Sequence, residues 1–224
     1  MGILSKDTSD EAEAVQLSIL RRMPHNRKAA VLQSALRAGL GLRQSGGAEM
    51  DPFEITHQVV AALERQGIEY FLGGSLASSL HGEPRFTQDA DLVVNLTQNC
   101  IPDLVAELSA DFYLSEQNLV HFTSGFKVDL MVSRQRPFDR ARFQRSQLMS
   151  AGGYEFRVAT PEDMVVVKLE WFRLGGEVSD RQWRDVLSLL LLSASDVSYM
   201  RTWSAELGVA DLLERALQEA GLSG

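Results

Sequence analysis

Three aspartates and a glycine-rich turn are the residues of this chain that could do chemistry. The triplet Gly-Gly-Ser at residues 73–75 follows an apolar run, and Asp89 and Asp91 lie two residues apart at the start of a second apolar run. Asp129 lies in a third apolar run. Carboxylates near a glycine turn are the groups needed to hold a divalent cation and a phosphate, so the pattern indicates a protein that handles a nucleoside triphosphate (NTP).

The aspartates sit in segments that alternate between apolar and polar residues. Residues two apart on a strand project from one face, so Asp89 and Asp91 are expected to point the same way. If the strand that carries Asp129 is a neighbour, three carboxylates converge, and their repulsion raises at least one pKa unless a cation lies among them. Mg²⁺ or Mn²⁺ suits such a site, with Asp89, Asp91 and Asp129 as ligands. The alternative is that these acids are solvated residues at strand ends.

The glycine-rich turn has a separate predicted role. Gly73 and Gly74 allow close approach of a phosphate to the backbone, and Ser75 begins a short helix whose first amides would point at that phosphate. Most Gly-Gly-Ser triplets are simple turns. This triplet indicates a phosphate site because it comes shortly before the aspartate pair. His81 is expected to be a residue at the end of the same helix.

The stretch from Tyr70 to Val94, YFLGGSLASSLHGEPRFTQDADLVV, resembles the signature of the DNA polymerase β-type minimal nucleotidyltransferases. It is most similar to a bacterial branch that includes AbiEii-type toxins and uncharacterised relatives, and the resemblance spans about residues 53–192. It implies a nucleotidyltransferase fold and catalytic roles for the three aspartates. It also implies that Lys127, in the Lys-x-Asp that ends at Asp129, contributes to the nucleotide site.

Three further residues have two interpretations each. Lys168, matched to a helical lysine of the family, either reaches a triphosphate or extends to solvent from an apolar helix face. Asp185, matched to a later aspartate, either serves the nucleotide site or pairs with Arg181 one turn before it. Arg85 either holds a phosphate or braces the metal loop.

Length and composition set the class of protein. The chain has 224 residues, of which 45% are hydrophobic and 23% charged, which predicts a packed core. The net charge of −8 disfavours a general nucleic-acid coat protein. Cys100 is the only cysteine, and no apolar run is long enough to span a bilayer. A cytoplasmic protein without a membrane partner is therefore expected.

Apolar periodicity predicts a mixed α/β (α+β) fold with a small mixed sheet and helices packed on it. The predicted organisation is a helical extension over 1–50, a core over 51–160 and a helical region over 161–224. Strands are expected at 68–72, 89–96, 112–114, 119–122, 126–132 and 154–158. Helices are expected after Pro52, over 75–80 and 101–108, after Thr160 and Ser179, and over 210–220, with Asp196 as a further cap. A basic loop or turn is expected over 134–145.

The function that follows is transfer of a nucleoside monophosphate from an NTP, such as ATP, to a hydroxyl. The resemblance implies an acceptor that is RNA (tRNA among the candidates) or protein, and a toxin role with a cognate antitoxin. Two alternatives stay open: a catalytically silent nucleotide-binding antitoxin or regulator, and a small-molecule nucleotidyltransferase of the aminoglycoside type. Arginines at 134, 136, 140, 142 and 145 would favour RNA if they lined a groove, and a solvated loop is the other interpretation.

Overall fold

The computed structural model describes residues 51–81, 89–115, 118–192 and 194–222. The predicted helical extension over 1–50 and Arg85 lie outside these residues. Among the described residues, no helix has the length and apolar character needed to cross a membrane.

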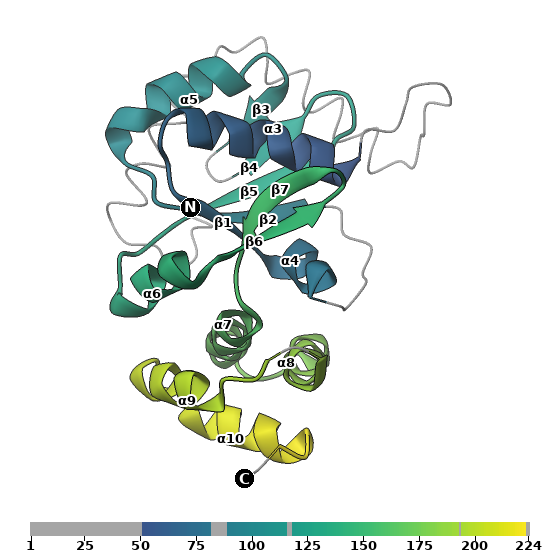
Figure 1. Ribbon diagram of the computed structural model, residues 1–224, viewed down its shortest axis with the longest axis vertical. Coiled ribbons are helices and arrows are strands. Elements are labelled where there is room, and N and C mark those ends of the chain that lie inside the picture. Colours follow the sequence, from purple (N-terminus) through teal and green to yellow (C-terminus); the bar gives the residue numbers. More distant parts are fainter. Residues whose placement is uncertain (1–50, 82–88, 116–117, 193, 223–224) are drawn as a thin grey trace.

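A seven-stranded mixed sheet forms the centre of the protein, in the order β3-β4-β5-β2-β1-β7-β6 (Figure 1). Its strands are β1 (Tyr70–Gly73), β2 (Asp89–Val94), β3 (Phe112–Leu114), β4 (Asn118–His121), β5 (Lys127–Val132), β6 (Gln147–Ala151) and β7 (Tyr154–Val158). The pairs β2·β5 and β1·β7 are parallel and the others antiparallel, so the predicted mixed α/β class is confirmed.

Helices cover the sheet and extend from it. They are α3 (Pro52–Arg65), α4 (Gly74–Leu80), α5 (Ile101–Leu108), α6 (Pro137–Arg145), α7 (Pro161–Leu174), α8 (Asp180–Leu192), α9 (Val197–Glu206) and α10 (Ala210–Glu219). In Figure 1, α3 and α5 lie on one side of the sheet, while α4 and α6 lie on the other, toward the group formed by α7 to α10. The predicted caps are confirmed: Thr160 Oγ1 accepts from Asp163 N, Ser179 Oγ from Gln182 N, and Asp196 Oδ1 from Tyr199 N.

The apolar faces of the central strands build the core. Ala90, Leu92 and Val94 of β2 are fully buried, as is Val128 of β5. This alternation leaves the aspartates of both strands on the opposite, half-buried face. The core therefore fixes which way the acidic side chains point, since a slip of one residue in register would bury them.

One prediction about residues 134–151 is wrong, and one strand in this segment was not predicted. The basic segment is the helix α6, which Pro137 begins and in whose first turn Asp139 Oδ2 accepts a hydrogen bond from the backbone N of Arg136 at 3.3 Å. The strand β6 was not predicted because its side chains are mostly exposed and carry little apolar signal. Gly152 and Gly153, both at positive φ, join β6 to β7 in a two-residue hairpin, and this glycine pair was the available signal.

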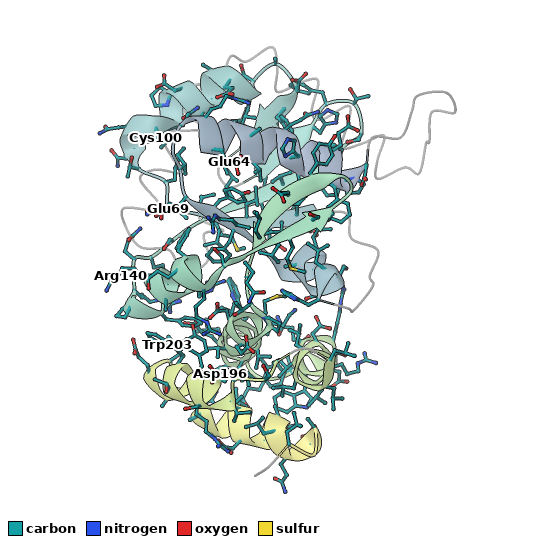
Figure 2. All side chains as sticks on the ribbon, in the orientation of Figure 1. Glu64, Glu69, Cys100, Arg140, Asp196 and Trp203 are labelled. Atoms are coloured by element: carbon teal, nitrogen blue, oxygen red, sulfur yellow. The ribbon has the colours of Figure 1, made fainter. Side chains whose placement is uncertain are left out.

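Side chains of α6 join the sheet to the helical region. Phe138 packs against Trp203 of α9 with ring centroids 5.2 Å apart (Trp203 is labelled in Figure 2). Arg136, the N-cap residue of α6, donates to Glu170 of α7. Phe143 of α6 packs against Phe71 of β1 with ring centroids 4.9 Å apart, so α6 links the sheet to the helices from α7 onward.

Candidate active site

Strands β2 and β5 bring the predicted carboxylates together. In the parallel register of these neighbours, Asp91 lies opposite Asp129 and Asp89 lies opposite Lys127. Because Asp89 and Asp91 are two residues apart, the three aspartates share one face of the sheet. The alternation of apolar and polar residues predicted that the aspartates of each strand lie on its polar face. The pairing of β2 with β5 brings Asp129 close to Asp91.

The electrostatics of the face are those of crowded acids. Burial, together with the charges of Asp89 and Asp129, raises the pKa of Asp91 to about 6. Burial also raises the pKa of Asp129, although Lys127 partly opposes this. The sequence predicted that at least one pKa would be raised, and the pKa values of Asp91 and Asp129 both are, with burial as the largest cause.

Lys127 neutralises part of this charge. Its Nζ lies 2.6 Å from Asp129 Oδ2. Burial alone would lower the pKa of Lys127, but the neighbouring aspartates outweigh it and hold the pKa above its usual range. Lys127 thus acts in this structure as the local cation that the carboxylates require.

Whether the aspartates fit a divalent cation depends on their free oxygens. Among the described residues, Asp129 Oδ1 is buried and accepts no hydrogen bond. The donors are all carboxylate oxygens, as Mg²⁺ and Mn²⁺ prefer, so the residues fit in charge and donor type. In the conformation seen, however, no three Asp, Glu, His or Cys side chains of the described ranges are gathered closely enough to hold a metal ion. The metal site stays a prediction.

The glycine-rich turn packs directly under Asp91. Gly73 pairs with Asp91 across β1 and β2, and Gly74 adopts φ +58° as the first residue of α4. A Cβ at Gly74 would lie 1.7 Å from Asp91 Oδ2, so only glycine fits there. Ser75, half-buried, follows at the second position of α4. The turn and the first carboxylate strand therefore form one unit.

Lys168 and Asp185 are brought together from α7 and α8. Lys168 Nζ donates to Asp185 Oδ2 at 3.1 Å, and both side chains are largely buried. The positive charge of Lys168 also lowers the pKa of Asp91 against the larger opposing effects, which places it near the aspartates. Asp185 thus has an ion-pair partner in Lys168 of the preceding helix, which the sequence did not indicate.

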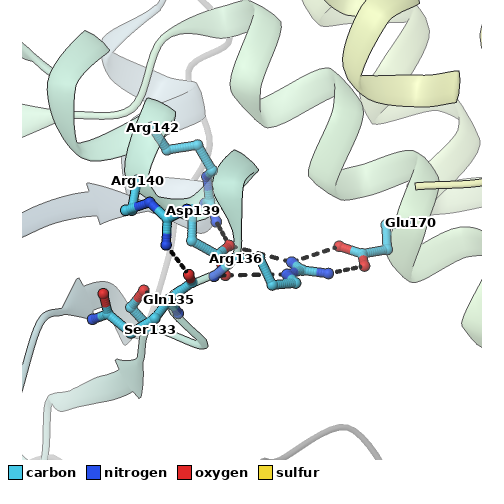
Figure 3. A network of polar contacts seen from close by, with 7 residues as sticks. All are labelled: Ser133, Gln135, Arg136, Asp139, Arg140, Arg142 and Glu170. Carbon is cyan, nitrogen blue, oxygen red and sulfur yellow. Dashed lines mark hydrogen bonds and ion pairs between the residues drawn. The ribbon is translucent and has the colours of Figure 1, made fainter. Parts of the chain in front are cut away.

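Most arginines of residues 134–145 make contacts within the protein, and Figure 3 shows those of Arg136, Arg140 and Arg142. Arg136 binds Asp139 at 3.1 Å and Glu170 at 2.6 Å. Arg142 is buried against the ring of Phe71, 4.7 Å from its centroid, and burial lowers its pKa.

Two more arginines of this segment have partners within the protein. Arg140 Nη1 donates to the backbone oxygen of Gln135, and Arg145 pairs with Glu162 at 3.5 Å. Glu170 and Glu162 were not singled out from the sequence, because their partners lie 34 and 17 residues away and no local pattern indicates them.

His81 has the structural role that was expected. It ends α4 as the C-cap, and its Nε2 lies 2.7 Å from the backbone oxygen of Ala159. This contact joins the end of α4 to the segment that leads into α7.

Comparison with known proteins finds solved structures of similar fold whose sequence identity to this chain is low. No family model matches the chain, and no curated protein matches it. Among solved structures, it is similar to an antigenic nucleotidyltransferase-like protein from Paracoccidioides brasiliensis (19% identity, 73% of this chain and 91% of that chain, TM-score 0.49).

Two further structures are similar. The antibiotic-resistance factor ANT(2'')-Ia has 15% identity over 76% of this chain and 94% of that chain, with a TM-score of 0.44. A putative nucleotidyltransferase from Thermotoga maritima has 16% identity over 59% of this chain and 92% of that chain, with a TM-score of 0.41. The structural neighbours are thus nucleotidyltransferase-like proteins.

Proposed function

We propose that this protein is a metal-dependent nucleotidyltransferase that moves a nucleoside monophosphate from an NTP to an acceptor hydroxyl. The acceptor oxygen bonds to the α-phosphorus, the bond from this phosphorus to the α–β bridging oxygen breaks, and pyrophosphate leaves. The observation that carries the proposal is the face shared by Asp89, Asp91 and Asp129, with Gly74 packed directly against Asp91.

The aspartates have distinct roles in this reaction. Asp89, Asp91 and Asp129 would hold Mg²⁺ or Mn²⁺, which when bound supplies positive charge to the reacting phosphate and lowers the pKa of a bound hydroxyl. Asp129 Oδ1, buried and without a hydrogen-bond donor among the described residues, would accept the proton of the acceptor hydroxyl. Because its pKa is raised, Asp129 suits the role of a general base better than an aspartate with the usual pKa.

Backbone and lysine groups would bind the triphosphate. Gly73, Gly74 and Ser75 form the turn beside Asp91, and Lys127 and Lys168 are the cations near the aspartates. Asp185 would orient Lys168, to which it is hydrogen-bonded. Arg85 belongs to the same proposal through the sequence pattern alone.

The arginine contacts bear on the acceptor. Arg136, Arg142 and Arg145 are committed to carboxylates of α6 and α7, so they do not offer the basic groove that would favour RNA. The acceptor classes to compare are therefore a protein hydroxyl, a small-molecule hydroxyl and RNA bound elsewhere on the protein. The toxin role, with its cognate antitoxin, is the biological setting that the sequence resemblance adds to this proposal.

The test is a labelling experiment with the full chain. The protein is incubated with each α-³²P-labelled NTP, Mg²⁺ or Mn²⁺, and in separate reactions total RNA, lysate protein or a panel of aminoglycosides. Label in one acceptor class, absent with Asp89→Asn/Asp91→Asn and retained with Glu155→Gln, an exposed carboxylate of β7, supports the proposal. Metal-dependent NTP binding without transfer to any acceptor would favour the silent regulator.

A further inference from the structure

Trp171 differs from the other two tryptophans of the chain. Its side chain is 44% exposed, and among the described residues its indole makes no ring contact, cation–π contact or hydrogen bond. By contrast, Trp183 is buried, lies against Phe172 and donates to Glu219. Trp203 packs against Phe138. The face of this indole is therefore open to a ligand, and an exposed aromatic face can stack on a flat ring.

The position of Trp171 on α7 can be worked out from the contacts of its neighbours. Successive residues are 100° apart around a helix, so the order around one side of α7 is Glu170, Trp171, Lys168 and Phe172. Glu170 contacts α6 through Arg136, and Phe172 contacts α8 through Trp183. Trp171 and Lys168 therefore lie on the arc of α7 between α6 and α8.

This arc faces the sheet rather than the C-terminal helices. Val166 and Leu169, on the opposite arc, are fully buried. Figure 1 places α9 and α10 on one side of α7 and the sheet with α4 on the other. The charge of Lys168 also reaches Asp91, as its effect on that carboxyl shows. Trp171 thus lies one helical turn from Lys168, on the side of α7 that faces the sheet and α4.

We propose that Trp171 stacks on the nucleobase of the bound NTP, an inference that rests on the proposed function. Lys168 and Trp171 match the two ends of this substrate, because a nucleotide carries negative charge on its phosphates and a flat aromatic ring on its base. Every base has a π face, so stacking adds affinity for all NTPs without selecting among them. The residue is a substrate-binding group outside the set that the sequence pattern indicated.

The test compares ligands with and without a base. Binding of α,β-methylene NTPs and of inorganic tripolyphosphate is measured for the full chain and for Trp171→Ala, Trp171→Phe and Leu174→Ala. Leu174 is the matched control, because it is exposed on α7 one turn further along. Trp171→Ala should weaken binding of every nucleotide about 5- to 100-fold and leave tripolyphosphate binding unchanged. Trp171→Phe should recover most of the affinity, and nucleotide should quench tryptophan emission in the wild type but not in Trp171→Phe.

Three results would overturn the inference. The first is that Trp171→Ala binds nucleotides as tightly as the wild type does. The second is that it loses affinity for tripolyphosphate to the same extent as for nucleotides, and the third is that it changes only the KM for the acceptor. Each of these leaves the proposed function standing, since the wild type still binds nucleotide. A wild type that binds no NTP in the presence of Mg²⁺ or Mn²⁺ removes the proposed function and the stacking role together.

Discussion

Replacing Asp91 by asparagine should make the metal-free protein more stable. The pKa of Asp91 is raised to about 6 in the folded state, and an unfolded aspartate titrates near pH 4. A raised pKa means that the protonated form stabilises the fold, fully below about pH 4, and that this contribution is lost as the pH rises through 6. Each pKa unit corresponds to about 1.4 kcal/mol, so ionised Asp91 costs about 3 kcal/mol above pH 7.

The assay is urea denaturation in the presence of a chelator at several pH values. At pH 8, Asp91→Asn should unfold with a free energy about 1–3 kcal/mol higher than the wild type, and the gap should narrow to about 1 kcal/mol or less at pH 4.5. Added Mg²⁺ or Mn²⁺ should stabilise the wild type more than the variant. Nucleotidyl transfer should be lost in the variant despite its greater stability.

The control for this comparison is Glu155→Gln, which removes an exposed carboxylate from β7. Its free energy of unfolding should stay within about 0.5 kcal/mol of the wild type at both pH values. The reasoning would be refuted if Asp91→Asn were less stable than the wild type at pH 8. A gap that did not change with pH would refute it equally, since the argument depends on titration of this carboxyl.

Three further substitutions test other parts of the site. Gly74→Ala should destabilise the protein by about 1–3 kcal/mol and abolish transfer, because Gly74 has a positive φ and the new Cβ would overlap the Asp91 carboxylate. The control is Gly208→Ala, since Gly208 also has a positive φ but no atom lies within 4 Å of its added Cβ. Measured by thermal denaturation, this control should lose about 1 kcal/mol of stability, and it should keep its activity. Lys168→Met should weaken NTP binding and lower the free energy of unfolding by about 1–3 kcal/mol, since its carboxylate partner on α8 stays largely buried; NTP and urea titrations measure both. Glu170→Gln should lower the melting temperature, because it weakens the ion pair with Arg136 at the start of α6. It should leave RNA binding in a gel-shift assay unchanged. A change in RNA binding would instead indicate that the arginines of residues 134–145 contact an RNA acceptor.

How far the candidate site could be predicted differs among its parts. The three aspartates and Gly74 were identifiable from local pattern, because strand alternation and glycine chemistry act over a few residues. Trp171 was visible only as part of an apolar helix face, since its exposure depends on how α6 and α8 pack around α7. The strand β6 was missed because its mostly exposed side chains do not produce the apolar alternation of a buried strand.

The sequence by itself determined the class of the fold, the caps of its helices and the face on which each aspartate lies, because these depend on local geometry and on burial of alternating apolar residues. Only the tertiary structure decided which charges meet. It paired Lys127 with Asp129 and Lys168 with Asp185, and it turned the arginines of α6 toward Asp139, Glu170 and Glu162. Partners in such contacts come from different elements, so their proximity is set by strand order and helix packing, which no local pattern contains.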